Sequence, residues 1–426
     1  MVPVINKIKF GQYPAYKDSG VEWLGEFPKH WGIIKYKFIS EIQKGKMPKK
    51  IVSKNVNNLP PYMSMEYLRG GEENQWVLDR TAKVINEDQT LLLWDGSNAG
   101  EFIKSRKGVI SSTVAQISFF NIDNSFAWYY SKFIEIELKS RTIGMGIPHV
   151  NGNELKNFYV LIPPLTEQTT IVQFLDHKTA LIDQAISIKQ KQIELLKERR
   201  QILIHKAVNH GLIHNVKLKD SGVEWIGEIP EGWATKKLKY ILHERNERSL
   251  TGNEPLLMMS QIHGLVIRAD YHDKAEVAKT TERNKIVYKN DLVFNKLKAH
   301  LGVFYKSNID FKGIVSPDYA VYFSNGVIPD LKFLELLFRT PEYLKEFICR
   351  ITGIVEGLMR LYTHDLFDIT VPVPPIKNQI EILKYIEVSD NKFATAISLK
   401  EQEIEKLKEY KATLINSAVT GKIKIY

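Results

Sequence analysis

The heptapeptide KDSGVEW occurs twice in this chain, at Lys17–Trp23 and again at Lys219–Trp225. The match extends beyond seven residues, because YKDSGVEWLGEFPKHW corresponds to LKDSGVEWIGEIPEGW with glycine, glutamate, proline and tryptophan in step. An agreement of this length is not expected by chance. The sequence therefore predicts a tandem duplication, in which one supersecondary arrangement is built twice.

A second pair of matching segments lies further along the chain. LIPPLTEQTTI (Leu161–Ile171) resembles VPVPPIKNQIEI (Val371–Ile382), with two prolines and a glutamine aligned. Proline fixes φ and has no N–H to donate, so a proline pair interrupts a strand and is tolerated at the start of a helix. Each segment is therefore predicted to end a strand and lead into a helix.

Each proline pair is followed by a long, charged and proline-free segment, from about Glu167 to Val208 and from about Asn378 to Val419. Apolar residues recur in both at steps that keep them on one helical stripe. The aligned positions are Leu175, Ile182, Ala185, Ile193, Leu196, Leu203 and Ala207 in the first segment, and Ile386, Phe393, Ala396, Ile404, Leu407, Leu414 and Ala418 in the second. Each segment ends near a glycine, Gly211 or Gly421, which is a common helix stop.

A helix of some 40 residues is roughly 60 Å long and cannot bury a narrow apolar stripe against itself. The equal helix of the other copy is the available partner. The connection from Gly211 to Lys219 is short, so a parallel pairing is excluded and an antiparallel pair is predicted, with one globule at each end. The alternative interpretation is that each segment is an ordinary amphipathic helix of a bundle.

The segments between these repeated parts are mixed in character. Strand-like runs are KVINE, TLLLW and NFYVLI in the first copy, and KIVYK, DLVFN and GIVSPDYAVYF in the second. A helical run follows in each, SFAWYYSKFIEIEL and LKFLELLFRTPEYLKEF, and Asn124 or Ser125 is the predicted cap of the first.

The predicted fold class is α+β, with two α/β globules separated by two long antiparallel coiled-coil helices in a pseudo-two-fold tandem duplication. We assign residues 1–163 and 216–374 to the globules. Residues 164–215 form the central helix and residues 375–426 the C-terminal helix.

Within this common framework the loops differ between the copies. LLLWDGSNAGEF (Leu91–Phe102) parallels DLVFNKLKAHLGVF (Asp291–Phe304), and GVIS parallels GIVS. In both copies a hydrophobic strand runs into a polar loop whose side chains suit base edges or phosphates. With nearby basic clusters, the candidate DNA-binding residues are Lys44, Lys46, Asp95, Ser97, Asn98, Lys104, Arg106, Lys107, Asn295, Lys296, Lys298, His300 and Ser316. A plain hairpin loop or a solvated charged face is the alternative for each of them.

Composition narrows the class of protein only modestly. The formal net charge of +10 favours polyanionic partners, although many basic proteins bind no nucleic acid. The single cysteine, Cys349, excludes an intrachain disulfide and a cysteine metal cluster. Because no apolar run approaches the ~18 residues of a membrane helix, and MVPVINKIKFGQ does not read as a signal peptide, a cytoplasmic protein is expected.

The sequence carries no recognisable catalytic motif. In NNLPPYM, Leu59 stands directly before Pro-Pro-Tyr, where an adenine-N6 methyltransferase needs an acidic or amide residue to hold the target amino group. The sequence has no GxxxxGK[ST] loop, no HExxH and no Cys/His pairing. It shows no carboxylate cluster with a nearby lysine of the kind that nuclease sites use. We therefore expect neither a catalytic site nor a metal site in this chain.

The paired KDSGVEW openings, the PPLTEQ and PPIKNQ helix entries and the AVTG ending resemble the DNA-specificity subunit of type I restriction–modification systems. The resemblance covers nearly the whole chain. One departure is Asn378, which replaces the usual acidic residue before the glutamine.

In that family each globule is a target-recognition domain that reads one half of a split DNA site, and the helices fix the gap. The resemblance implies double-stranded DNA, two methyltransferase subunits and two restriction subunits as partners. S-adenosylmethionine, ATP and Mg²⁺ would be bound by those subunits, and this chain would need no cofactor.

Two other functions remain open on the sequence alone. A self-sufficient methyltransferase or nuclease with an unrecognised site would be active as an isolated chain. A coiled-coil scaffold that binds only protein would account for the helices, but it gives no reason for two diverged globules on a retained framework.

Overall fold

The computed structural model describes residues 11–425 except 56–57, 80, 145, 214, 261–262, 272–280 and 353–359. The chain forms two compact units, Met1–Gln190 with Glu401–Tyr426 (unit 1) and Lys191–Lys400 (unit 2). Most of MVPVINKIKFGQ lies outside the described residues. None of the helices in the described part is long and apolar enough to cross a membrane.

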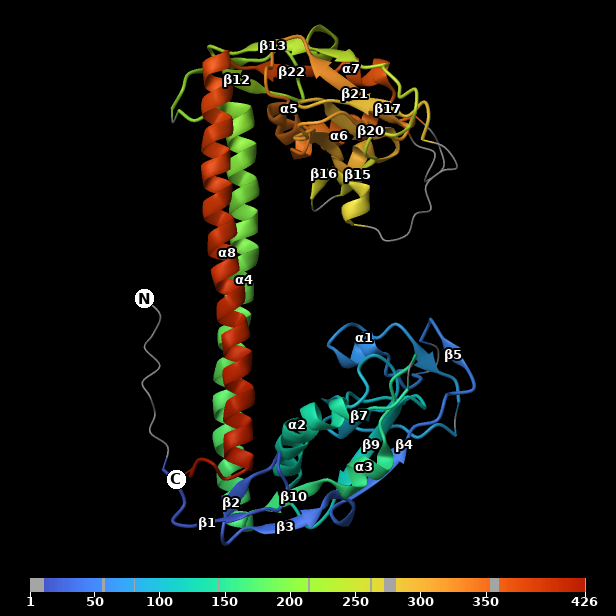
Figure 1. Cartoon of the computed structure of the whole chain (residues 1–426), viewed down its shortest axis with the longest axis vertical. Coiled ribbons are helices and arrows are strands. Elements are labelled where there is room, and N and C mark those ends of the chain that lie inside the picture. Colours follow the sequence, from blue (N-terminus) through green and yellow to red (C-terminus); the bar gives the residue numbers. More distant parts are fainter. Residues whose placement is uncertain are drawn as a thin grey trace. The chain divides into compact units, whose positions relative to one another are not determined.

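Unit 1 is organised around an antiparallel sheet with strand order β4-β9-β7-β8. These strands are β4 (Ser40–Lys44), β9 (Val114–Phe119), β7 (Thr90–Leu93) and β8 (Phe102–Lys104). The β7 residues Leu91, Leu92 and Leu93 are buried because β7 is an inner strand covered on both faces, which explains the unbroken apolar run in the sequence. The core includes α2 (Asn124–Ser140), shown beside the sheet in Figure 1. The remaining elements of the globule are β1 (Tyr16–Asp18), β2 (Glu26–Pro28), β3 (Gly32–Lys35), η1 (Tyr36–Phe38), β5 (Ile51–Val52), α1 (Met65–Leu68), β6 (Trp76–Val77), α3 (Gly152–Asn157) and β10 (Tyr159–Ile162).

Unit 2 contains a sheet of the corresponding order, β14-β21-β18-β19. Its strands are β14 (Leu242–Glu244), β21 (Tyr319–Ser324), β18 (Leu292–Asn295) and β19 (Phe304–Lys306). The other elements are β11 (Leu218–Asp220), β12 (Glu228–Pro230), β13 (Ala234–Lys237), η2 (Leu238–Tyr240), β15 (Leu257–Ser260), β16 (Gly264–Ile267), η3 (Arg268–Asp270), β17 (Lys285–Val287), η4 (Lys296–Leu301), β20 (Gly313–Val315), α5 (Lys332–Leu337), α6 (Pro341–Arg350), α7 (Thr363–Phe367) and β22 (Thr370–Val373).

The repeated KDSGVEW segment forms the turn of a small hairpin in each unit. In unit 1, β1 pairs with β2, and in unit 2, β11 pairs with β12 in the same register. Asp18 accepts a hydrogen bond from the N–H of Gly20 at 3.0 Å, and Asp220 accepts one from Gly222 at 2.9 Å. Both glycines have positive φ, a conformation that side chains other than glycine disfavour. The identity of the heptapeptide therefore reflects the demands of this turn.

The proline pairs end strands β10 and β22 and precede the two long helices, α4 (Leu165–His210) and α8 (Ile376–Val419), as predicted. The aligned glutamines lie buried in the first turn of each helix. Gln168 donates to the carbonyl of Pro163 at 2.9 Å, and Gln379 donates to that of Pro374 at 2.8 Å. Gln168 also accepts from the N–H of Asp123 at 2.8 Å, so one side chain joins the strand end, α2 and α4.

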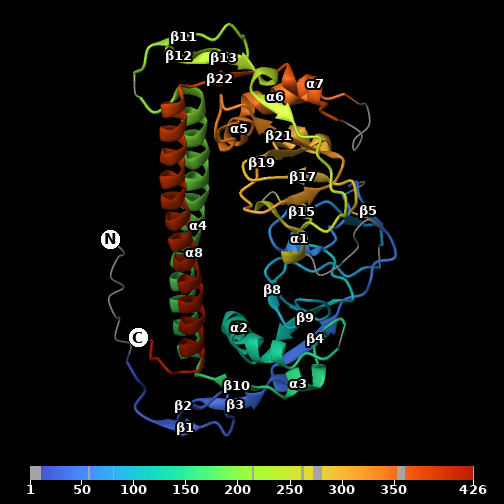
Figure 2. The same cartoon turned by 45° about the horizontal axis from the view of Figure 1, so that its top comes forward.

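The two long helices run antiparallel within each unit, as Figures 1 and 2 show. In unit 1, Asp183 of α4 pairs with Lys411 of α8, and in unit 2, Arg200 of α4 makes a two-pronged ion pair with Asp390 of α8 at 2.8 and 2.9 Å. The predicted stripe residues are buried or half-buried on both helices. The predicted α+β class with two long helices is confirmed. The assigned domain boundaries stay predictions, because the units divide both helices between them.

Each long helix ends at a glycine that packs on a tryptophan. Gly211 follows α4 with φ +76° and lies against Trp233, and Gly421 follows α8 with φ +71° and lies against Trp31. A Cβ atom at Gly421 would stand 2.4 Å from Pro28, so no other residue fits there without movement.

Several local predictions were wrong. The cap of α2 is Asp123, which accepts from the N–H of Phe126 at 2.9 Å, so neither Asn124 nor Ser125 has that role. LKFLELLFRTPEYLKEF forms two helices, α5 and α6, because Pro341 begins a new helix at its first position. KVINE forms only an isolated bridge at Ile85. The polar loop after β18 is the 3₁₀ helix η4.

Replacement of Gln168 by alanine is expected to lower the free energy of unfolding by about 1–3 kcal/mol, because a buried carbonyl and a buried N–H lose their partner. Thermal and urea unfolding monitored by circular dichroism measure the change. Gln173→Ala, at an exposed site on the same helix, is the matched control and should change stability little. Equal effects of the two substitutions would contradict the capping role.

Candidate nucleic-acid interface

In unit 1 the structure brings two predicted residues together at one end of the sheet. Lys44 is the last residue of β4 and Asp95 follows β7, and the Nζ and Oδ2 atoms are 3.4 Å apart. The Lys44 ammonium also lies 5.1 Å from the ring centre of Trp94. The N–H groups of Trp94 and Asp95 both donate to the carbonyl of Thr113, which fixes the turn before β9 next to this pair. A half-buried indole beside a cation and a carboxylate suits contact with bases and phosphates.

Lys46 lies on the segment after β4 and lines a cavity of about 390 Å³. Four lysines line it, together with amide and apolar side chains: Lys44, Lys46, Lys49 and Lys83. The Lys83 ammonium donates to the side-chain oxygens of Gln43 at 2.5 Å and Gln116 at 3.1 Å, which holds it against the sheet. Lys46 is exposed, so its charge is available to an anion at the cavity mouth.

Ser97 and Asn98 form the exposed tip of the turn that follows Asp95. The turn begins at Gly96, whose φ of +105° lies in the region that favours glycine. Its N–H donates to the carbonyl of Pro148 at 2.9 Å, which ties the turn to the segment before α3. Both polar side chains therefore project from a backbone that is fixed at its base.

The basic cluster after this turn is mostly engaged within unit 1. Lys104 pairs with Asp88 at 3.2 Å and lies 4.9 Å from the ring centre of Trp128. Arg106 donates to the carbonyls of Tyr67 at 3.2 Å and Gly71 at 2.7 Å, with its guanidinium over the Tyr67 ring. These contacts give Arg106 a structural role, and Lys107 is the exposed residue of the three.

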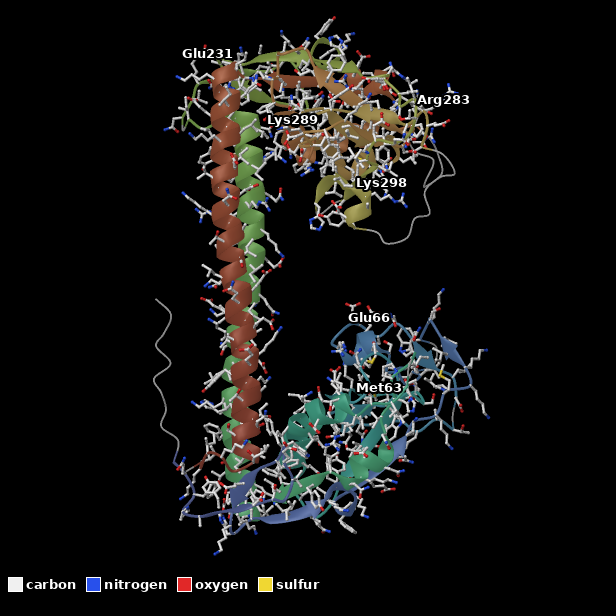
Figure 3. All side chains as sticks on the ribbon, viewed as in Figure 1. Met63, Glu66, Glu231, Arg283, Lys289 and Lys298 are labelled. Carbon is white, nitrogen blue, oxygen red and sulfur yellow. The ribbon has the colours of Figure 1, made fainter. Side chains whose placement is uncertain are left out.

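In unit 2 the corresponding residues begin with Asn295, the last residue of β18, whose side chain accepts from the N–H of Leu297 and caps η4. Lys296 is half-buried, and burial, together with the nearby Lys285 ammonium, lowers its pKa. An approaching phosphate would favour the charged form and so strengthen its own binding. Lys298 is exposed on η4 and is labelled in Figure 3.

His300 and Ser316 occupy different settings in unit 2. The Nδ1 atom of His300 is buried and has no hydrogen-bond partner within the described part of the chain. Ser316 follows β20, and its carbonyl accepts from the N–H of Tyr319. Tyr319 lies opposite Asn295 in the sheet register, so the turn containing Ser316 stands beside the start of η4.

Some residues of these sites were not predicted from the sequence. Trp94 immediately precedes the predicted loop, and Lys83 and Lys285 are the first residues of the aligned runs KVINE and KIVYK. Lys285 is buried and pairs with Glu244 of the edge strand β14 at 3.2 Å, as Lys83 bonds Gln43 of the edge strand β4. The lysine that begins both KVINE and KIVYK is the sequence signal that indicates these two residues.

The described residues contain no group of three histidine, cysteine, aspartate or glutamate side chains placed to hold a metal ion. The acidic residues nearest the candidate interface are engaged with cations, as Asp95 is with Lys44 and Glu244 is with Lys285. The arrangement is suited to binding a polyanion through lysines, amides and a half-buried indole.

Comparison with known proteins finds one matching family model and several similar proteins. Residues 28–198 match the type I restriction modification DNA specificity domain. The sequence is 28% identical over 412 residues to the type I restriction enzyme MjaVIII specificity subunit of Methanocaldococcus jannaschii, covering 93% of this chain and 94% of that protein. Over nearly its whole length the chain is similar to type I DNA-specificity subunits.

Further specificity subunits are similar to this chain at lower identity. The EcoKI specificity subunit of Escherichia coli is 24% identical over 62% of this chain and 57% of its own. A chain from a structure of complex assembly and conformational transition of the type I R-M system superposes with a TM-score of 0.65 at 13% identity, covering 93% of this chain and 99% of that chain. The HsdS subunit from Thermoanaerobacter tengcongensis gives 0.50 at 15% identity, covering 95% and 100%. These two structures show a common fold.

Lys46→Ala and Arg106→Ala are expected to differ in effect. Loss of the exposed Lys46 charge should weaken DNA binding at every sequence and lower the slope of log K against log salt by about 1, with the thermal midpoint unchanged. Arg106→Ala should lower the thermal midpoint, because two carbonyl partners are lost. Fluorescence anisotropy over a salt series and thermal unfolding measure both effects. The reverse pattern would contradict these assignments.

Proposed function

We propose that this chain is the DNA-reading subunit of a type I restriction–modification complex. Each globule would read one half of an asymmetric, bipartite target, and the paired helices would set the gap between the halves and dock adenine-N6 methyltransferase subunits. We also infer that the two units descend from a tandem duplication, which their common strand order supports.

The observation that carries this proposal is a shared sheet with different side chains at one end. β7 and β18 occupy the same position in the two sheets and pair in the same way with β9 and β21. The residues that follow differ, since Trp94, Asp95 and Gly96 stand where unit 2 has Lys296, Leu297 and Lys298. A common framework that carries different polar residues at the sheet end supports two globules that recognise different DNA sequences.

The excess of basic residues supports the same substrate. Lysines neutralise phosphates and release counterions, which gives affinity without sequence preference. Sequence preference would then come from the differing side chains at the sheet ends. Weak, salt-sensitive DNA binding by the isolated chain and tight, specific binding with methyltransferase subunits are the expected behaviour.

The decisive experiment maps methylated adenines in DNA treated with the reconstituted complex, before and after residues 40–150 are exchanged for those of a relative with another target. The exchange begins at β4 and replaces its sheet, so one half-site should change while the other half and the gap persist. Long-read sequencing of methylated DNA provides the measurement. A change in both halves, or methylation by the wild-type complex at a single continuous palindrome, would overturn the proposal.

The long helices also carry exposed apolar residues that their mutual pairing leaves uncovered. In unit 1, α4 exposes Leu181 (48%) and Ile188 (50%), and in unit 2 it exposes Leu195 (62%) and Ile202 (47%). Their spacing of seven residues places them on one face of the helix. Large apolar side chains on an otherwise charged helix support a protein partner there, which the proposal identifies as a methyltransferase subunit.

Ile188→Glu is expected to weaken co-purification of the methyltransferase subunit at least tenfold, because a charge would be buried in the interface. The thermal midpoint of the isolated chain should not change, since the residue is exposed. Gln184→Glu, also exposed on α4, is the matched control. Retention of the partner by Ile188→Glu would place the docking surface elsewhere.

The remaining parts of the complex follow from this role. Two methyltransferase subunits would bind S-adenosylmethionine, and two restriction subunits would use ATP and Mg²⁺, while this chain would supply no cofactor site. The competing functions are distinguishable by assay. Activity of the isolated chain with S-adenosylmethionine or Mg²⁺ would favour a self-sufficient enzyme, and absence of DNA binding at low salt with all partners would favour a protein scaffold.

A further inference from the structure

A segment that the sequence did not single out lies directly beside the candidate interface of each unit. It runs into α3 in unit 1 (residues 149–156) and into α7 in unit 2 (residues 360–367), and we call it the pre-helix segment. The N–H of Val150 donates to the carbonyl of Trp94 at 2.9 Å, and the N–H of Leu361 donates to that of Lys296 at 3.1 Å. In both units, therefore, an equivalent backbone hydrogen bond joins the pre-helix segment to the first residue after the inner strand, which is β7 in unit 1 and β18 in unit 2.

The start of the pre-helix segment is fixed by a second shared feature. Ile143 and His149 exchange backbone hydrogen bonds of 3.0 and 2.8 Å in unit 1, and Thr352 and Arg360 exchange bonds of 3.0 and 2.9 Å in unit 2. In unit 1, His149 also forms a bridge with Asp95, one of the predicted DNA-binding residues. Both pre-helix segments are thus held as rigid parts of the candidate interface.

The buried residues of this segment agree between the units and the polar residues do not. Val150 and Leu155 are 2% and 0% exposed, and Leu361 and Leu366 are both 0% exposed. The accessible positions around these anchors carry unlike chemistry. They pair His149 with Arg360, Asn151 with Tyr362 and Asn153 with His364.

We propose that the accessible side chains of the pre-helix segments are specificity-determining residues that contact base edges in the two half-sites. This inference rests on the proposed function and extends it to residues outside the predicted loops. To the residues of the predicted loops it adds base contacts by Asn153 and Lys156 in unit 1, and by Arg360, Tyr362 and His364 in unit 2.

In unit 1 the available groups are an amide and an ammonium. The Asn151 oxygen accepts from the N–H groups of Asn153 and Glu154 and so acts within the helix cap. The Asn153 side chain is exposed, and its amide has no hydrogen-bond partner among the residues that the structure describes. Asn153 and Lys156 line a hollow of about 270 Å³ that they share with Lys44 and Trp94. An amide pairs with adenine in the major groove, and an ammonium with guanine.

In unit 2 the same positions offer a cation and two aromatic rings. The rings of Tyr362 and His364 stack with centroids 5.9 Å apart and planes 16° apart. Both side chains are exposed, which leaves their faces and edges accessible. Arg360 lies close enough to Lys296 to lower the pKa of that lysine. A guanidinium favours guanine, and an apolar ring edge favours the thymine methyl group, so the second half-site should differ in base preference from the first.

The test compares methylation profiles of the full complex carrying Asn153→Ala, Lys156→Ala or His364→Ala on a library randomised in both half-sites. Asn153→Ala and Lys156→Ala should each reduce discrimination about tenfold at one or two positions of the first half-site, within the range of one base contact. His364→Ala should do the same in the second half-site only. Asn157→Ala, an exposed amide one turn further along α3 and outside the hollow, is the control and should change neither.

The outcomes separate this inference from the proposed function. Unchanged base preference in all three variants, with bipartite methylation retained, would overturn the inference and leave the proposed function intact. A wild-type complex without bipartite methylation would overturn both. Thermal unfolding of each variant shows whether it remains folded, and the two independent substitutions in unit 1 keep the test decisive if one of them destabilises the chain.

Discussion

The pairing of α4 with α8 is the interaction on which both units depend. In each unit the core includes residues from both helices, although these segments lie about two hundred residues apart in the sequence. Neither helix half could bury its apolar stripe alone, because a narrow stripe on an isolated helix stays in contact with water. In unit 1, Leu175 of α4 and Leu414 of α8 are both buried, and in unit 2, Ala207 of α4 and Ile386 of α8 are both buried. The formation of each globule is therefore coupled to both long helices.

Polar contacts determine where these helices begin and end. Burial of the Gln168 and Gln379 amides against proline carbonyls fixes the first turns, and the glycine–tryptophan contacts fix the last. In unit 1, the carboxylate of Glu167 also accepts hydrogen bonds from the side chains of Tyr13, His30 and Trp31. Burial opposes ionisation of Glu167, but these hydrogen bonds outweigh it and lower its pKa. Asn378 stands at the corresponding position of unit 2, so the hydrogen-bonded carboxylate of Glu167 is a feature of unit 1.

The candidate interface follows from this framework because three chain segments meet at one sheet end in each unit. A backbone hydrogen bond joins the strand end to the pre-helix segment in both units, and in unit 1 two more join the strand end to the turn before β9. Backbone bonds tolerate any side chain, so the exposed residues are free to differ while the scaffold stays fixed.

The sequence by itself determined that the KDSGVEW segment is built twice, and it determined the strand–proline–helix entries, both long helices and the apolar stripe, because these depend on repetition, proline chemistry and helical periodicity. It also placed Lys44 and Asp95 among the candidate residues. Only the tertiary structure decided which of the basic side chains are available to bind a polyanion and which are engaged within the protein. Arg106 is engaged with backbone carbonyls and Lys104 with Asp88, whereas Lys83 joins the lysines of a cavity formed by segments distant in sequence. A linear pattern records residue type and spacing, but the side of the molecule on which a charge lies, and the partner it meets, are fixed only when distant segments pack together.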